Sequence, residues 1–185
     1  MKLKTSYFLL IISVIINFFF VSIIMNPNEE QSEISYSFSD ISGVPIEDII
    51  DLINNSDSSL NIAIYNLDNT DIVDAVLSAK QRGVEIKIII DKEKAENNDT
   101  EKILTKFYKE NIPVKINTEK KMHMKLAISD SKIIAVGSLN YTSDSAEENQ
   151  ENLITIQNTK LANEFVEIFE KMWESDSYSL WKPKK

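Results

Sequence analysis

A single histidine stands among residues that can bind phosphate. His123 is the only histidine in the 185 residues. Within about thirty residues of it the chain carries an ammonium, a hydroxyl, two amides and a carboxylate. These groups belong to Lys125, Ser138, Asn140, Asn149 and Glu151. A neutral imidazole can attack phosphorus while the other groups hold the phosphate oxygens, so the combination predicts attack on a phosphodiester.

Strand parity predicts that the reacting groups share one face of a sheet. Side chains two residues apart on a strand point the same way, so His123 and Lys125 share a face, as do Ser138 and Asn140. A two-residue hairpin turn at 131–132 would place His123 opposite Asn140. The same turn would place Lys125 opposite Ser138.

Other residues near His123 and Lys125 are expected to support the site or to be weaker candidates for binding the substrate. Asp130 is seven residues from His123, so parity places it on the other face or at the turn, as a structural residue. Gly137 and Asn149 are also expected to support the site. Weaker candidates for substrate binding are Lys120, Lys121 and Tyr65. The chain has three glycines and no glycine-rich phosphate loop, which excludes nucleotide-binding folds of that kind.

The elements that must position these groups alternate between strand and helix patterns. Repeated β-α-β units predict an α/β domain with a mixed, largely parallel sheet flanked by helices. Thr70 is expected to cap the second helix, and 92–100 to be an ordinary connection. Strands are expected at 34–39, 60–65, 84–90, 114–116, 124–129, 132–136 and 153–157, and helices at 45–54, 71–82, 101–111 and 162–173.

The N-terminal 25 residues predict a membrane anchor. Lys2 and Lys4 precede about 18 mostly apolar residues, and a helix of that length rises about 27 Å, close to the hydrocarbon thickness of a bilayer. The flanking charges predict a domain outside the cytoplasm. A cleaved signal peptide, giving a secreted domain, is the alternative. We expect a linker at 26–33, the catalytic domain at 34–175 and a tail at 176–185.

Composition narrows the classes of partner. The absence of cysteine excludes disulfides and thiolate metal sites. The formal net charge is −9, of which Lys2 and Lys4 contribute +2, so the remainder carries −11. An acidic surface argues against tight duplex binding but not against local phosphate capture in a lysine-lined cleft.

The run from His123 to Asn140 reads His-x-Lys, then Asp130, then Gly-Ser-x-Asn. In order and spacing it resembles the signature of the phospholipase D superfamily. The segment from Asn149 to Asn152 is similar to a further element of that family, and the resemblance spans about 34–175. It points to the single-motif branch, which is similar to small bacterial endonucleases and mitochondrial cardiolipin hydrolase.

The resemblance implies a metal-independent phosphodiesterase that needs no cofactor. It assigns His123 as the nucleophile that forms a phosphohistidine, Lys125, Ser138 and Asn140 as ligands of the phosphate oxygens, and Glu151 as the orienting partner of the imidazole. Larger members carry two motifs per chain. One motif here implies a homodimer with its active site at the two-fold interface.

The substrate is left open between two classes. We expect a nuclease, with single strands favoured because a duplex needs a broad positive surface. A phospholipid hydrolase of the cardiolipin type is the alternative. A catalytically inactive phosphate-binding scaffold is a third hypothesis, although binding alone would not need an oriented nucleophile.

Overall fold

The computed structural model of the chain describes residues 2–25 and 31–184. Helix α1 (Lys2–Met25) belongs to one compact unit, and the residues from Ser32 onward form the other. A helix therefore forms where the anchor was predicted. Within the described residues, none of the helices combines the length and the apolar character needed to cross a membrane. Most of the predicted linker, residues 26–30, lies outside the described residues.

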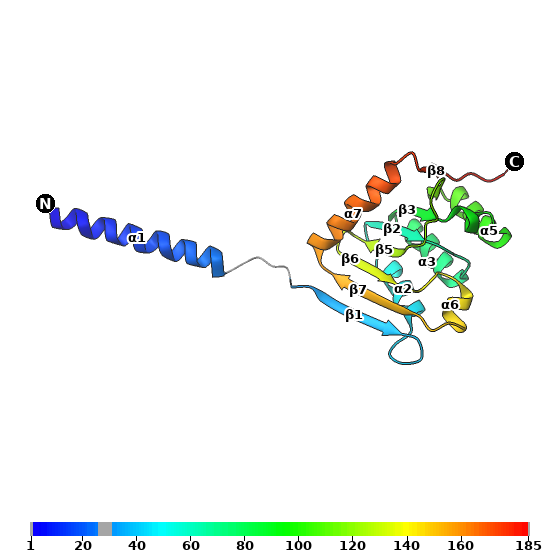
Figure 1. Cartoon of the computed structure of the whole chain (residues 1–185), viewed down its shortest axis with the longest axis horizontal. Coiled ribbons are helices and arrows are strands. Elements are labelled where there is room, and N and C mark those ends of the chain that lie inside the picture. The colour runs from blue at the N-terminus through cyan, green and yellow to red at the C-terminus, as the bar shows by residue number, and fades with distance from the viewer. Residues whose placement is uncertain (1, 26–30, 185) are drawn as a thin grey trace. The chain divides into compact units, whose positions relative to one another are not determined.

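The domain is built on one mixed sheet of eight strands (Figure 1). Their order across the sheet is β1-β7-β6-β5-β2-β3-β4-β8. The strands are β1 (Glu33–Phe38), β2 (Ser59–Ile64), β3 (Glu85–Ile90), β4 (Val114–Asn117), β5 (Lys125–Ser129), β6 (Ile133–Gly137), β7 (Asn152–Gln157) and β8 (Tyr178–Leu180).

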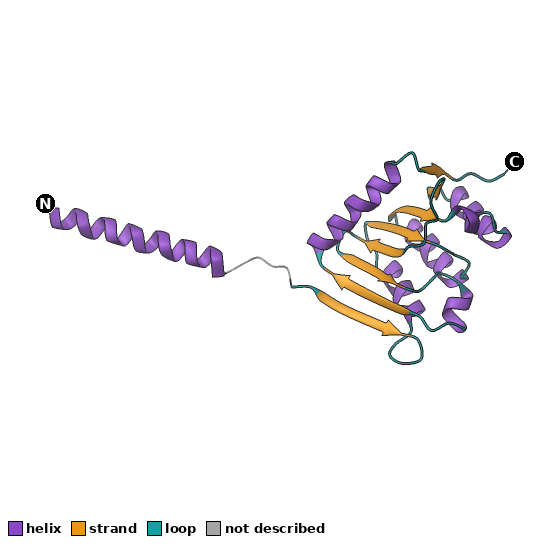
Figure 2. Cartoon of the chain, viewed as in Figure 1, coloured by secondary structure: helices purple, strands orange, loops and turns teal. Residues whose placement is uncertain are grey.

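Helices cover both faces of the sheet (Figure 2). One core cluster packs residues of α2, α3 and α5 against the sheet, and the second packs α7 against residues such as Leu126, Ile128 and Ile134. The domain helices are α2 (Pro45–Asn54), α3 (Thr70–Gln81), α4 (Lys92–Ala95), α5 (Asn98–Lys109), α6 (Ser143–Glu147) and α7 (Thr159–Glu174).

The mixed sheet confirms the predicted fold class, but the expectation of a largely parallel sheet is wrong. Only the pairs β2–β3 and β3–β4 are parallel, and the other strand pairs are antiparallel. The parallel pairs join strands linked by helical crossovers. Strands β5 and β6 are linked by a tight turn that forces antiparallel pairing, whereas β6 and β7 pair antiparallel across the longer segment 138–151, which contains α6. Strand β3 is buried on both faces, as its apolar sequence predicted.

Three local predictions need correction. The side chain that caps α3 is Asn69, whose Oδ1 accepts hydrogen bonds from the N–H groups of Asp71 and Ile72, and Thr70 is the first helical residue. The segment 92–100 is not a plain connection, because it contains α4 and the start of α5. Part of the expected tail forms β8, which pairs with β4, and the N–H of Trp181 donates to the carbonyl of Val114.

Candidate active site

His123 lies just before β5, in contact with a lysine and a tyrosine. The Nζ atom of Lys125 is 3.3 Å from both ring nitrogens of His123 and 3.3 Å from its carbonyl oxygen. The ring of Tyr65, just after β2, lies 4.4 Å from the imidazole centroid at 52°. The imidazole is exposed and Lys125 is half-buried, so the pair can be reached from solvent.

The backbone on either side of His123 is held by buried groups. The N–H of Met122 donates to Oδ2 of Asp91 at 3.0 Å, and Asp91 is buried at the end of β3. The carbonyl of Met124 accepts from the N–H of Tyr65 at 2.9 Å. The segment bearing the imidazole is therefore tied to two neighbouring strand ends, which fixes where the ring can lie.

A second polar cluster forms where β6 ends and β7 begins. The hydroxyl of Ser138 donates to Oε2 of Glu151, and that of Ser145 donates to Oε1 at 2.9 Å. Ser138 and Asn152 are also joined reciprocally: the N–H of Ser138 donates to Oδ1 of Asn152, and the N–H of Asn152 donates to the Ser138 hydroxyl. Glu151 and Asn152 thus fix the rotamer of Ser138, and Ser138 and Ser145 satisfy both oxygens of the buried Glu151 carboxylate.

The expected partnership of Glu151 with His123 is not what this structure contains. Both carboxylate oxygens of Glu151 accept from serine hydroxyls instead. The physical reason is the strand order, since Glu151 precedes β7 and His123 precedes β5, with β6 between them. Glu151 still acts on the first cluster through its charge: burial lowers the pKa of Lys125, and the Glu151 carboxylate partly offsets that shift.

Gly137 is required at its position by close packing of the backbone. A Cβ atom there would lie 2.1 Å from the carbonyl oxygen of Asn152 and 2.9 Å from its carbonyl carbon. Only a residue without a side chain lets β6 approach β7 at this point. The glycine therefore allows the close approach of β6 and β7 beside Ser138.

The predicted register of the β5–β6 hairpin is wrong by one residue. Leu126 pairs with Val136, so Lys125 is aligned with Gly137 and not with Ser138. The central turn residues are Asp130 and Ser131, each at φ 53°, and the N–H of Lys132 donates to the carbonyl of Ser129. Two adjacent residues with positive φ are the mark of a type I′ turn.

Hydrogen bonds to the Asp130 carboxylate fix the position of the turn. Its carboxylate accepts hydrogen bonds from the N–H groups of Asp57, Ser58 and Ser59 and from the Ser58 hydroxyl. Partial burial acts to raise the pKa of Asp130, but the donors outweigh it and lower the pKa to about 2. The location at the turn is as predicted, and Asp130 anchors the hairpin to the start of β2.

We expect Asp130→Asn to lower the free energy of unfolding at pH 7 by about 1–2 kcal/mol, a figure reduced for partial solvent exposure. The pKa of Asp130 is below the ordinary 3.8 in the folded state, so its stabilisation is present above that value. It is lost as pH falls toward about 2. Urea unfolding at pH 7 and at pH 2.5 measures this. The exposed neighbour Asp57→Asn is the control, and an Asp130 effect of equal size at both pH values would contradict the assignment.

The remaining predicted residues are spread more widely. Oδ1 of Asn140 is buried without a hydrogen-bond partner within the described part of the chain. Asn149 is exposed, and its N–H donates to the carbonyl of Asp144. Lys121 lies with Nζ 5.0 Å from the Tyr65 ring centroid. Lys120 is exposed and lines a different hollow, beside α7.

Sequence reasoning missed several residues that build the site. Ser145 holds Glu151, Asn152 holds Ser138, and Lys94 lies with Nζ 5.1 Å from the Tyr65 ring centroid. Asn152 could have been found from its place beside Glu151. Lys94 and Ser145 could not be found in this way, because they lie on the short helices α4 and α6. The spacing of apolar residues did not predict these helices.

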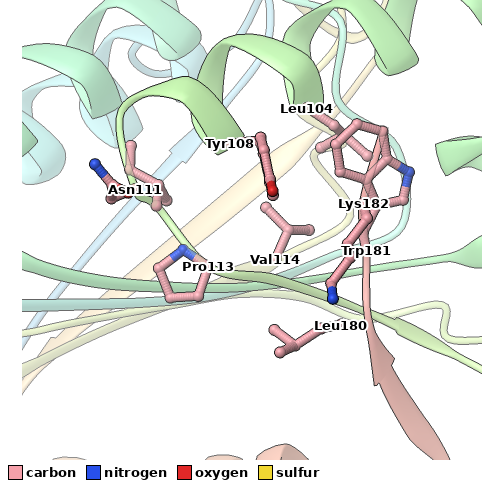
Figure 3. A pocket seen from close by; sticks show the side chains of 9 residues that line it. Leu104, Tyr108, Asn111, Pro113, Val114, Leu180, Trp181 and Lys182 are labelled. Carbon is pink, nitrogen blue, oxygen red and sulfur yellow. The ribbon is translucent and has the colours of Figure 1, made fainter. Parts of the chain in front are cut away.

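Two hollows differ in their relation to these clusters. One, formed by α5, β4 and the residues after β8, is largely apolar, with Tyr108, Val114 and Trp181 among its walls (Figure 3). It contains none of the predicted site residues. The other is lined by Ser138, Glu151 and Asn152 together with Phe38 and Ile41. Over the residues that the structure describes, no group of three or more histidine, aspartate or glutamate side chains could hold a metal ion.

Comparisons with known proteins point to one family. The family described as "Cardiolipin synthase, PLD-like domain" matches residues 49–173. Mitochondrial cardiolipin hydrolase from Chlamydomonas reinhardtii is 31% identical over 126 residues, which are 68% of this chain and 56% of that protein. A phospholipase D from Rickettsia prowazekii is 28% identical over 120 residues, which are 64% of this chain and 58% of that protein. The chain thus spans little more than half of these relatives.

Solved structures agree with the fold. NucT from Helicobacter pylori has a TM-score of 0.72 and 27% identity, covering 82% of this chain and 100% of that one. Nuc from Salmonella typhimurium, a phospholipase D family member, has a TM-score of 0.75 and 24% identity, covering 82% of this chain and 99% of that one. Both solved structures therefore share one fold with this chain over 82% of its length.

Proposed function

Because the chain belongs to the phospholipase D-like family, we propose that it hydrolyses phosphodiesters through a phosphohistidine on His123. The observation that carries this proposal is the contact between Lys125 and the imidazole. The Lys125 ammonium lies 3.3 Å from both ring nitrogens, so it can hold a phosphate oxygen beside the nitrogen that attacks phosphorus. A ring nitrogen forms a bond to phosphorus as the bond to the leaving oxygen breaks, and water later cleaves the phosphorus–nitrogen bond.

The groups that would bind the phosphate come from two polar clusters, one around His123 and one around Ser138 and Glu151. Lys125 neutralises charge on the non-bridging oxygens as it develops in the transition state. Ser138 can donate to a phosphate oxygen if its hydroxyl turns away from Glu151. Asn140 is the third ligand that the motif implies. Glu151 then serves as a positioning residue that holds Ser138, and its charge opposes the lowering of the Lys125 pKa by burial.

We propose that the active unit is a homodimer. One histidine per chain cannot both attack phosphorus and protonate the leaving oxygen in the same step, so His123 of the partner subunit would supply that proton and later activate water. Exposed apolar residues adjoin the active-site residues that one chain contributes, since Phe38 and Ile41 line the hollow that contains Ser138 and Glu151. Ile34, Tyr36 and Ile41 are 60%, 65% and 81% exposed, and a second copy of the chain would cover them.

Nucleic acid is the substrate class that we propose, with single strands preferred. An aromatic ring surrounded by lysines beside the nucleophile suits an extended phosphate backbone, while the acidic remainder of the domain disfavours a duplex. Phospholipid is the second candidate, because the relatives named above are a cardiolipin hydrolase and a phospholipase D.

The domain from Ser32 onward is expected to hydrolyse bis(p-nitrophenyl) phosphate in excess EDTA, since no step requires a metal ion. Release of p-nitrophenol gives the rate. A requirement for added divalent ions would contradict the mechanism. Single-stranded DNA, duplex DNA, RNA and vesicles of cardiolipin or phosphatidylcholine, offered in parallel, then separate the two substrate classes.

We further propose that α1 directs the domain to a location outside the cytoplasm, as an anchor or as a cleaved signal. Its exposed side chains include Phe18, Phe19 and Phe20, which an aqueous setting would disfavour. Fractionation of cells that express the full chain, with protease added from outside, tests this proposal. Protection of the domain inside intact cells would contradict it.

A further inference from the structure

Three lysines converge on one tyrosine beside the nucleophile. The Nζ atoms of Lys94, Lys121 and Lys125 lie 5.1, 5.0 and 5.1 Å from the centroid of the Tyr65 ring. Such distances allow cation–π attraction, which holds long flexible side chains near one point. The lysines come from α4, from the segment before His123 and from β5, so only the tertiary fold assembles them.

Within the described residues no carboxylate oxygen lies closer than 3.7 Å to these three ammonium groups, although Asp91 and Glu93 act on Lys121 and Glu151 acts on Lys125 through their charges. Lys121 lies 3.7 Å from Glu93, whose side chain is mostly exposed, and a surface pair at that distance is weak. Among residues 2–25 and 31–184, Lys94 makes no ion pair. Three neighbouring ammonium groups repel one another. Their convergence on the Tyr65 ring therefore forms a site where a bound anion would relieve this repulsion.

The three lysines divide into two roles. Lys125 contacts His123 directly and is the lysine expected to meet the phosphate under attack. Lys94 and Lys121 reach the Tyr65 ring, which itself contacts the imidazole, but neither of them contacts His123 within the described residues. They are therefore placed to bind a second negative charge, separated from the reacting phosphate by about the width of the tyrosine.

We propose that Lys94 and Lys121, held over Tyr65, bind the phosphate that flanks the scissile one in a nucleic acid strand. This subsite rests on the proposed function, because it takes its meaning from attack by His123. With this subsite, the preferred substrate has at least two consecutive phosphates along the strand. It also gives Tyr65 the role of orienting both lysines.

The test compares substrates that share one cleavable bond. Dithymidine phosphate has a single phosphodiester, and adding a 5′- or 3′-terminal phosphate supplies the flanking charge on one side or the other. For the wild-type domain we expect one of the two phosphorylated forms to show a kcat/KM about 10-fold higher at low salt, chiefly through KM. The same comparison at high salt should reduce this preference, because the lysines are exposed to solvent.

In Lys94→Ala and Lys121→Ala the ratio of kcat/KM with and without the terminal phosphate should fall toward 1. Lys94→Arg should keep much of it, and Lys109→Ala, an exposed lysine on α5, should leave it at the wild-type value. A wild-type ratio near 1 for both phosphorylated forms would overturn the subsite while leaving the proposed function intact. A preference for cardiolipin over phosphatidylglycerol, with no such effect on dinucleotides, would overturn its assignment to nucleic acid. No turnover of dithymidine phosphate or of bis(p-nitrophenyl) phosphate would overturn the proposed function and the subsite together.

Discussion

His123→Asn is expected to lower kcat on every phosphodiester by at least about 10³-fold, because it removes the nucleophile and, in a dimer, the general acid as well. The fold should survive, since the imidazole is exposed and its ring contacts are confined to Lys125 and Tyr65 within the described residues. Steady-state kinetics of the purified domain measure the loss, and circular dichroism with size-exclusion chromatography reports the fold and the assembly.

Mixing this variant with wild type tests the shared site. After co-refolding of equal amounts, about one quarter of randomly assorted dimers are wild-type pairs. Total activity should therefore fall with the square of the wild-type fraction. Co-refolding with Asp74→Asn, a change at an exposed position on α3, should leave activity unchanged. A linear dependence on the wild-type fraction, or full activity in a monomer, would show that each chain works alone.

Lys125→Met is expected to lower kcat by about 10²–10³-fold, the usual loss when one donor to a developing oxyanion is removed. Methionine keeps an unbranched, flexible side chain of similar length and removes the ammonium group with its charge and its N–H donors. Lys132→Met, at an exposed position on the same hairpin, is the matched control and should have wild-type kinetics. A loss confined to KM would contradict a transition-state role for Lys125 and indicate ground-state binding instead.

The pH dependence of kcat/KM gives a second test of the role of Lys125. Burial lowers its pKa from the ordinary 10.5 despite the nearby Glu151 carboxylate. The ammonium is therefore lost at a lower pH than that of a surface lysine, and the alkaline limb of kcat/KM should begin to fall below pH 10.5. Glu151→Gln removes the offsetting charge, so it should move that limb to still lower pH. An unmoved limb would show that another group controls it.

Much of the fold could be predicted from the order of residues. Apolar periodicity placed α2, α3, α5 and α7 and most strands within a few residues, because each buries a continuous stripe or face. Short elements were missed: α4, α6 and β8 have three to five residues each, too few to show a period. The proportion of parallel strands was also misjudged, since a local pattern can predict a hairpin such as β5–β6 but not the pairing of strands that are distant in sequence.

The sequence by itself determined which groups are available: one imidazole, with Lys125 two residues away and Ser138 and Glu151 farther along the chain. Only the tertiary structure decided which of them meet. Hydrogen bonds from 57–59 to Asp130 placed the turn and shifted the register, and strand order gave Glu151 to Ser138. Packing of α4 brought Lys94 to Tyr65. These are contacts between residues distant in sequence, whose geometry is fixed by the packed sheet and not by local spacing.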